Sequence, residues 1–175
     1  LGGDQVTNDL AQALKTSTNN AEELKIRYGC VTSVFENDDV IEVPGVGDRP
    51  ARSVRKKTIV QVMSDRYQEI FTFVKEKIQQ SGFEDRIPAG IVLTGGSSKT
   101  EGIEDLAEEV FHAQVRVGIP EHIYGGSEDI IKNPEYATCV GLLIYAKEKE
   151  STKFVQSDND FQSSIKKLLK KIFYE

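Results

Sequence analysis

The sequence is poor in the residues that build metal centres and disulfide frameworks. It has two cysteines, two histidines and no tryptophan in 175 residues. Cys30 and Cys139 lie far apart and form no CxxC pair, so we expect them to be the reduced thiols of a cytosolic protein. His112 and His122 do not have metal-ligand spacing, which argues against a histidine-based metal site.

Long hydrophobic runs are also missing. No apolar run approaches the ~20 residues that a membrane-spanning helix needs, and the first residues do not have the pattern of a secretory signal peptide. The chain begins at Leu1 and not at a methionine. We therefore expect it to be the C-terminal piece of a longer protein.

Negative charge dominates, but it is unevenly distributed. The net charge is -6, while residues 161–175 carry four lysines against Glu175, a local charge of +3 that leaves -9 for the first 160 residues. An acidic body of this kind argues against nucleic-acid binding. Charged residues at 29% and hydrophobic residues at 38% are typical of a soluble globular protein.

Hydrophobic spacing and turn residues predict a mixed α/β chain. Helices are expected at 4–15, at 20–28, at 58–81, through 103–111 and from Pro134 onward, and strands at 30–35, 39–44, 90–94 and 114–117. The last helix has small and apolar residues on all sides, so we expect it to be buried. We interpret 1–35 and 88–147 as one subdomain, 36–87 as a smaller inserted subdomain, and 148–160 as a flexible linker.

Two glycine pairs mark the candidate ligand site. Gly2 and Gly3 precede the first helix, and Gly95, Gly96 and Ser97 follow the strand at 90–94. A glycine lets a ligand approach the backbone because no Cβ intervenes, and hydroxyls and amides near a helix start can bind a nucleoside or a phosphate. The alternative for each pair is an ordinary tight turn.

Glu22 and Lys25 are three residues apart on a predicted helix and therefore share one face. An acid and a base placed in this way can flank a sugar or a purine. The alternative is a solvated ion pair without a ligand.

A basic run follows the segment "GVGDRP" and continues onto the long helix. An acidic body with one cationic face suits an acidic peptide, because arginine pairs carboxylates through two hydrogen bonds. The alternative is a solvated charged edge. The candidate partner-binding residues are Arg52, Arg55, Lys57, Arg66 and Tyr67.

The last fifteen residues, 161–175, have the pattern of a cationic amphipathic helix. Such a helix binds a membrane surface through its apolar face, and each lysine near anionic lipid adds about 1 kcal/mol. The alternative is a helix that docks on its own domain or on a partner protein. The apolar stripe consists of Phe161, Ile165, Leu168, Leu169, Ile172 and Phe173, and it is flanked by Lys166, Lys167, Lys170 and Lys171.

Taken in order, several motifs of the chain resemble a known family. These are Leu-Gly-Gly before a helix, "AEELKIRYG", "GVGDRP", "AGIVLTGGSSK", "LAEEVF" and "NPEYATCVGLLIYA". Together they resemble the C-terminal half of the actin/DnaK-type ATPases, and in their details the FtsA family of bacterial cell-division proteins. The resemblance implies an actin-like (ribonuclease H-like) α/β ATPase lobe with a small α/β inserted subdomain and a C-terminal amphipathic helix.

The resemblance also implies a nucleotide site. Gly2 and Gly3 would border the nucleotide, Glu22 and Lys25 would lie beside the adenosine, and 95–97 would form the adenosine motif. ATP is the implied cofactor, with Mg²⁺ held by phosphate loops expected upstream of this chain. The residues present are therefore expected to bind ATP poorly and to hydrolyse nothing alone, and the family implies at most weak ATPase activity.

The implied role is that of an adaptor at the division site, on the cytoplasmic face of the bacterial inner membrane. It would bind the C-terminal peptide of the tubulin-like protein FtsZ, other division proteins, copies of itself in a head-to-tail filament, and the anionic membrane surface. The competing hypotheses are a sugar kinase or chaperone-type ATPase of the same superfold, and a cell-shape or pilus-assembly homologue. The basic insert and the amphipathic tail favour the division protein.

Overall fold

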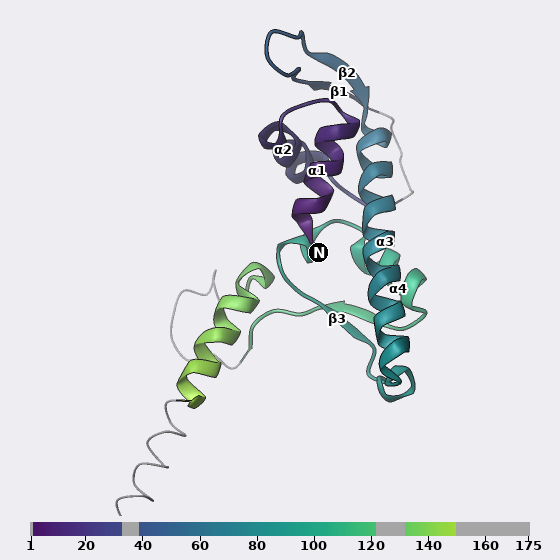
Figure 1. Ribbon diagram of the computed structural model, residues 1–175, viewed down its shortest axis with the longest axis vertical. Coiled ribbons are helices and arrows are strands. Elements are labelled where there is room, and N and C mark those ends of the chain that lie inside the picture. Colours follow the sequence, from purple (N-terminus) through teal and green to yellow (C-terminus); the bar gives the residue numbers. More distant parts are fainter. Residues whose placement is uncertain (1, 33–38, 122–131, 150–175) are drawn as a thin grey trace, which may run out of the picture. The chain divides into compact units, whose positions relative to one another are not determined.

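The computed structural model describes residues 2–32, 39–121 and 132–149 (Figure 1). The chain divides into two compact units, Leu1–Ile119 and Pro120–Glu175. All helices and strands that form the candidate ligand site belong to the first unit. The predicted linker at 148–160 lies almost wholly outside the described residues, and the predicted amphipathic helix at 161–175 lies entirely outside them.

Two short helices open the first unit and confirm the predicted helices at 4–15 and 20–28. They are α1 (Gly3–Ala13) and α2 (Thr18–Tyr28). Helix α2 begins before Asn20 because Ser17 caps it, and the Ser17 hydroxyl accepts a hydrogen bond from the Asn20 backbone N–H at 3.2 Å. Val6 and Leu10 of α1 are fully buried in the core of this unit, and Leu24 of α2 is buried with them.

Helix α3 (Lys56–Ser81) is the longest element, as predicted, and ends at Gly82 in the left-handed conformation with φ of 72°. Its helical spacing predicts a core-facing stripe, and only the first half of this stripe is buried; the stripe consists of Ile59, Met63, Tyr67, Ile70, Val74 and Ile78. Ile59, Met63 and Tyr67 are in the core, whereas Val74 is 39% exposed. The first half packs on α1, and the second half packs on α4 (Ile103–Phe111), as the contacts of Phe71 with Phe111 and of Lys75 with Val110 show (Figure 1).

A two-stranded antiparallel sheet precedes α3. Strand β1 (Val40–Val43) was predicted, whereas β2 (Arg52–Arg55) was not, because its sequence Arg-Ser-Val-Arg has weak strand propensity. Strand β2 forms because its backbone pairs with β1 and places Val54 opposite the buried Ile41. The predicted strand at 30–35 appears only as an isolated bridge between Cys30 and Glu101, and 33–35 lie outside the described residues.

The remaining elements of the first unit confirm a strand–turn–helix–strand prediction. Strand β3 (Ile91–Leu93) leads into the short 3-10 helix η2 (Gly96–Lys99), then α4, then β4 (Val115–Val117). Strands β3 and β4 are parallel, with Ile91 opposite Val115. The glycine turn at 95–97 therefore leaves the carboxyl end of a parallel strand, which is where open α/β sheets commonly bind ligands.

The second unit is described at residues 132–149. Asn133 caps the 3-10 helix η3 (Pro134–Tyr136) by accepting a hydrogen bond from the Glu135 N–H at 3.1 Å, as the Asn-Pro pair predicted, and residues 137–149 continue as a helix. The expectation that this helix is buried stays a prediction. Its all-round apolar surface needs neighbours on every side, and of these residues only Pro134 and Val140 are buried.

The sequence predicted free cysteines and no membrane-spanning helix, and both expectations can be compared with the described residues. Cys30 is buried, Cys139 is exposed, and both are free. In the described parts of the chain, no helix is both long and apolar enough to cross a lipid bilayer.

We predict that Gly29→Ala destabilises the first unit. Gly29 caps the end of α2, and a Cβ there would lie 2.2 Å from the carbonyl oxygen of Lys25 and 2.7 Å from Cε of Met63. Because a backbone atom cannot move away cheaply, we expect the free energy of unfolding to fall by about 2 kcal/mol or more in urea titrations of the full-length protein.

The matched control is Gly141→Ala, because a Cβ at Gly141 would meet nothing within 4 Å. It should leave the main unfolding transition unchanged or slightly raise stability. Equal effects of the two substitutions would show that the packing around Gly29 is not as tight as described.

Candidate functional site

The two glycine turns predicted to bind a ligand lie against each other in the structure. A Cβ at Gly3 would lie 2.9 Å from Oγ of Ser97 and 3.2 Å from Nζ of Lys25. The start of α1, the middle of α2 and the turn after β3 therefore converge on the α-carbon of Gly3. Three segments that are far apart in the sequence meet at this point.

The other glycines of these turns leave space beside the backbone. A Cβ at Gly2 or at Gly95 would meet nothing within 4 Å. Gly95 has a φ of 92°, a conformation that favours glycine, whereas Gly2 is extended at 171°. Gly96 begins η2, and the buried Ser98 secures the turn by donating its hydroxyl to the Gly95 carbonyl at 2.7 Å.

A small hollow of about 150 Å³ lies beside the turns. Its lining combines hydroxyl groups and glycine backbone with apolar side chains. This combination suits a ligand with an apolar ring and polar edges. The lining residues are Gly2, Tyr67, Ile70, Phe71, Leu93, Thr94, Ser97, Ser98 and Ile103.

Glu22 and Lys25 form the predicted ion pair, and a third residue completes it. Nζ of Lys25 lies 2.7 Å from Oε2 of Glu22, donates to Oγ1 of Thr7 at 2.8 Å and donates to the carbonyl of Gly3 at 3.3 Å. The Thr7 hydroxyl also hydrogen-bonds Oε2 of Glu22. The pair is therefore tied to α1 and is not a freely solvated surface pair.

The environment of Glu22 keeps it ionised. Partial burial raises its pKa, but the hydrogen bonds from Lys25 and Thr7 and the positive charge of Lys25 outweigh burial, so that the pKa lies below the usual 4.5. The Glu22 side chain is 41% exposed. A ligand can therefore reach a carboxylate that carries its charge at neutral pH.

Thr7 was missed by the sequence analysis, although a signal for it was present. It follows Val6, lies one helical turn after Gly3 and is 4% exposed. A polar side chain at a core-facing position of an amphipathic helix needs a hydrogen-bond partner. This requirement could have directed attention to the residues that face it from α2.

The structure separates the five candidate partner-binding residues. Arg52 and Arg55 lie exposed on β2, and Lys57 lies exposed at the start of α3. Arg52 donates a hydrogen bond to the Leu14 carbonyl. Tyr67, in contrast, is 3% exposed and stacks on Phe71, so its ring belongs to the core and not to the cationic surface.

Arg66 lies away from these basic residues and is held by carboxylates of the first unit. Its guanidinium pairs both oxygens of Asp9 on α1, with Nη2 and Oδ1 2.9 Å apart, and it also pairs Glu69. A two-point arginine–carboxylate pair fixes geometry as well as charge. Arg66 therefore joins α3 to α1.

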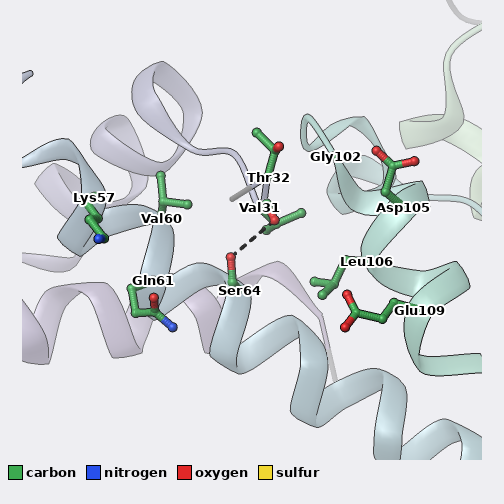
Figure 2. A pocket seen from close by; sticks show the side chains of 10 residues that line it. All are labelled: Val31, Thr32, Lys57, Val60, Gln61, Ser64, Gly102, Asp105, Leu106 and Glu109. Atoms are coloured by element: carbon green, nitrogen blue, oxygen red, sulfur yellow. Dashed lines mark hydrogen bonds between the residues drawn. The ribbon is translucent and has the colours of Figure 1, made fainter. Parts of the chain in front are cut away.

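A larger hollow of about 530 Å³ lies between α3 and α4. Figure 2 shows Gln61 and Ser64 on one wall, with Asp105 and Glu109 on the other, and the Ser64 hydroxyl donates to the Val31 carbonyl at 3.5 Å. Of the candidate partner-binding residues only Lys57 lines this hollow. Its two carboxylates make it a poor match for an acidic ligand.

The described residues do not bring together three histidine, cysteine, aspartate or glutamate side chains in a way that could hold a metal ion. The membrane-binding residues predicted between Phe161 and Phe173 lie outside the described part of the chain.

We predict that Glu22 contributes an acid-sensitive part of the stability. Since its pKa in the folded protein is lowered below 4.5, its stabilising contribution is present above that pH and is lost as the pH falls through the lowered value. In urea titrations at a series of pH values, Glu22→Gln should therefore flatten the loss of stability in acid. Glu23→Gln, which removes a carboxylate from the same helix, is the control. If wild type and Glu22→Gln lose stability in parallel, the network does not stabilise the ionised carboxylate.

The first comparison is with solved structures that have a similar fold. MreB5 of Spiroplasma citri bound to ADP matches with a TM-score of 0.64 at 14% identity, over 86% of this chain and 46% of that one. MreB 5 of Spiroplasma citri bound to AMPPNP matches with a TM-score of 0.63 at 16% identity, over 89% and 46%. These matches show an actin-like fold and confirm the predicted fold class. The amphipathic helix of that prediction is not tested by them.

Sequence relatives give the family. The family model for cell division protein FtsA matches residues 1–141. FtsA of Pseudomonas aeruginosa is 51% identical over 152 residues, which are 86% of this chain and 36% of that protein. FtsA of Escherichia coli K12 is 38% identical over 178 aligned positions, which span 97% of this chain and 42% of that protein. The chain thus spans about two fifths of these relatives, and it belongs to the FtsA family of cell-division proteins.

Proposed function

We propose that this chain supplies one wall of an ATP site in a cell-division adaptor. The observation that carries the proposal is the convergence at Gly3 of two glycine turns and of Lys25, which pairs with the ionised, half-exposed Glu22, in an FtsA-family chain with an actin-like fold. The two solved relatives of the same fold are described as bound to ADP and to AMPPNP. They support a nucleotide as the ligand class.

The residues present fit a nucleoside better than a phosphate chain. Glu22 offers a charged acceptor to ribose hydroxyls, which are hydrogen-bond donors. The Ser97 hydroxyl and the open backbone at Gly2 and Gly95 offer polar contacts and close approach for an adenosine edge. We infer that the phosphates and the Mg²⁺ that accompanies them are held mainly by other residues of the protein.

We predict that Glu22→Gln weakens ATP binding to the full-length protein. A hydrogen bond to a charged group contributes about 1.5 to 3 kcal/mol, which corresponds to a loss of roughly tenfold to a hundredfold in affinity. Isothermal titration with ATP measures this loss, and Glu23→Gln on the same helix should bind like wild type. If the two variants bind ATP with equal affinity, or if wild type binds none, the proposed site is wrong.

The adaptor part of the proposal concerns protein partners. We infer that the FtsA-family chain acts with division-ring proteins at the division site and associates with copies of itself. The exposed Arg52, Arg55 and Lys57 offer a cationic surface for an acidic peptide such as the C-terminal peptide of FtsZ. Arg66 is a weaker candidate because it is already paired to Asp9, and the buried Tyr67 can act only by supporting α3.

The membrane part of the proposal rests on the sequence of 161–175. Its apolar stripe and four lysines suit the anionic inner face of the cytoplasmic membrane. The preceding residues 148–160 would act as the tether. A sugar kinase or chaperone-type ATPase of the same superfold would have no use for such an ending, and membership of the FtsA family favours the division adaptor over a cell-shape or pilus-assembly role.

We predict that the four lysines from Lys166 to Lys171 are needed for binding to anionic vesicles. Their replacement by glutamine removes about 1 kcal/mol per lysine, or a few kcal/mol in total. The affinity of the full-length protein for vesicles containing phosphatidylglycerol, measured by co-sedimentation, should therefore fall by two orders of magnitude or more. As a control, Lys147→Gln and Lys149→Gln, which precede the tail, should change it little. Undiminished sedimentation of the tail variant would contradict the membrane proposal.

A further inference from the structure

Strand β4 pairs with another strand along one side only. The N–H of Gly118, which directly follows β4, donates to the Leu93 carbonyl of β3 at 2.7 Å. Among the described residues no strand other than β3 pairs with β4. Because successive backbone groups of a strand point to opposite sides, the N–H groups of Val115 and Val117 face away from β3. These two residues form the outer edge of the sheet.

Two glutamates of α4 occupy these outward donors. The Val115 N–H donates to Oε1 of Glu108 at 2.9 Å. The Val117 N–H donates to Oε1 of Glu104 at 2.8 Å. The spacings match, because residues four apart on a helix rise by about 6 Å and residues two apart on a strand by about 6.6 Å. Both hydrogen bonds are exposed to solvent, so water could satisfy the same donors. The glutamates are therefore not needed to satisfy buried backbone.

A carboxylate at each donor opposes the addition of another strand. A strand that joined this edge would bring its carbonyl oxygens to the N–H groups of Val115 and Val117, where the glutamate oxygens already lie. It would have to displace two hydrogen bonds to charged acceptors, which are stronger than hydrogen bonds between neutral groups. The carboxylates would also repel the incoming carbonyl oxygens.

Arg116 opposes the most direct pairing, which is that of β4 with β4 of a second copy. In a two-fold symmetric antiparallel pair, Val115 of each copy would face Val117 of the other, and the exposed Arg116 would lie opposite Arg116 of the second copy. Like charges directly opposite each other destabilise a strand pair. The side chain of Arg116 therefore acts against the same contact as the two glutamates.

We propose that Glu104, Glu108 and Arg116 close the outer edge of β4 against pairing with a second copy of this chain. An unpaired edge strand is a template for association through backbone hydrogen bonds. The proposed self-association would bring copies close together, and a closed β4 edge directs their contact to other surfaces. The inference is independent of the proposed ATP site, and it is tested without nucleotide.

The first experiment measures whether the carboxylates hold the edge. In the full-length protein, Glu104→Ala together with Glu108→Ala should speed amide hydrogen exchange in the peptides that span β4 by about tenfold, because each outward donor loses a charged acceptor. Glu104→Gln together with Glu108→Gln keeps an acceptor oxygen and should exchange more slowly than the alanine pair. Glu109→Ala, on the same helix, should exchange like wild type. Equal exchange in wild type and the alanine pair would overturn the proposal, since the edge would then be open or covered by another segment.

The second experiment opens the edge completely. Glu104→Ala, Glu108→Ala and Arg116→Thr together remove both carboxylates and the opposed positive charges, and threonine is well suited to a strand. Sedimentation velocity of the full-length protein should show dimers at concentrations at least tenfold below those at which wild type associates. Arg116→Thr alone, with both glutamates in place, should associate less readily than the triple variant. A triple variant that associates no more readily than wild type would overturn the proposal.

The concentration dependence of exchange shows where the copies meet. Dimers that pair through β4 protect its amides, so exchange in β4 of the triple variant should slow as the protein concentration rises, while exchange in β1 stays constant. Association without this protection would place the contact on another surface and contradict the proposal. Because all three side chains are exposed, thermal unfolding should remain cooperative in every variant, and this control is measured alongside.

Discussion

The structure of the candidate site depends on one steric constraint, the absence of a side chain at Gly3. Ser97 and Lys25 both approach to within about 3 Å of where a Cβ would be. A larger residue would displace the Ser97 hydroxyl and the Lys25 ammonium from their present positions beside the start of α1. The Gly2–Gly3 pair was predicted to let a ligand approach the backbone. At Gly3, however, the side chains of Ser97 and Lys25 make this close approach.

The consequences extend from packing to charge. Once α1 and α2 are in contact, Thr7 of α1 can reach both Glu22 and Lys25 of α2, and the pKa of Glu22 is lowered although burial alone would raise it. A similar cross-connection at the opposite side of α1 pairs Asp9 with Arg66 of α3. Hydrogen bonds to Thr7 thus tie α1 to α2, and the Asp9–Arg66 ion pair ties α1 to α3. The position of the ligand-facing residues therefore depends on all three helices.

Much of this fold could be predicted from the sequence, because local signals were consistent. The apolar spacing of α3, the glycine at its end and the strand–glycine–helix pattern from Ile91 to Phe111 all specify one structure. Strand β2 could not be predicted, since its pairing with β1 and not its own propensity determines it. Tyr67 was assigned in two ways, since its helical spacing placed it on the core-facing side of α3 and its place after a basic run suggested a surface role. The structure agrees with the helical spacing, because Tyr67 is 3% exposed and stacks on Phe71.

The residues of the candidate site could be recognised from the sequence only in part, for a related reason. Gly3, Glu22, Lys25 and Ser97 were each recognisable by residue type, and the structure brings them together. The role of Thr7 depends on a contact between helices that spacing along one helix does not reveal. The direct test of the account is a crystal structure of the full-length protein with a non-hydrolysable ATP analogue. The account predicts a ribose hydroxyl about 3 Å from a carboxylate oxygen of Glu22. A nucleotide bound away from Glu22 and Ser97 would contradict it.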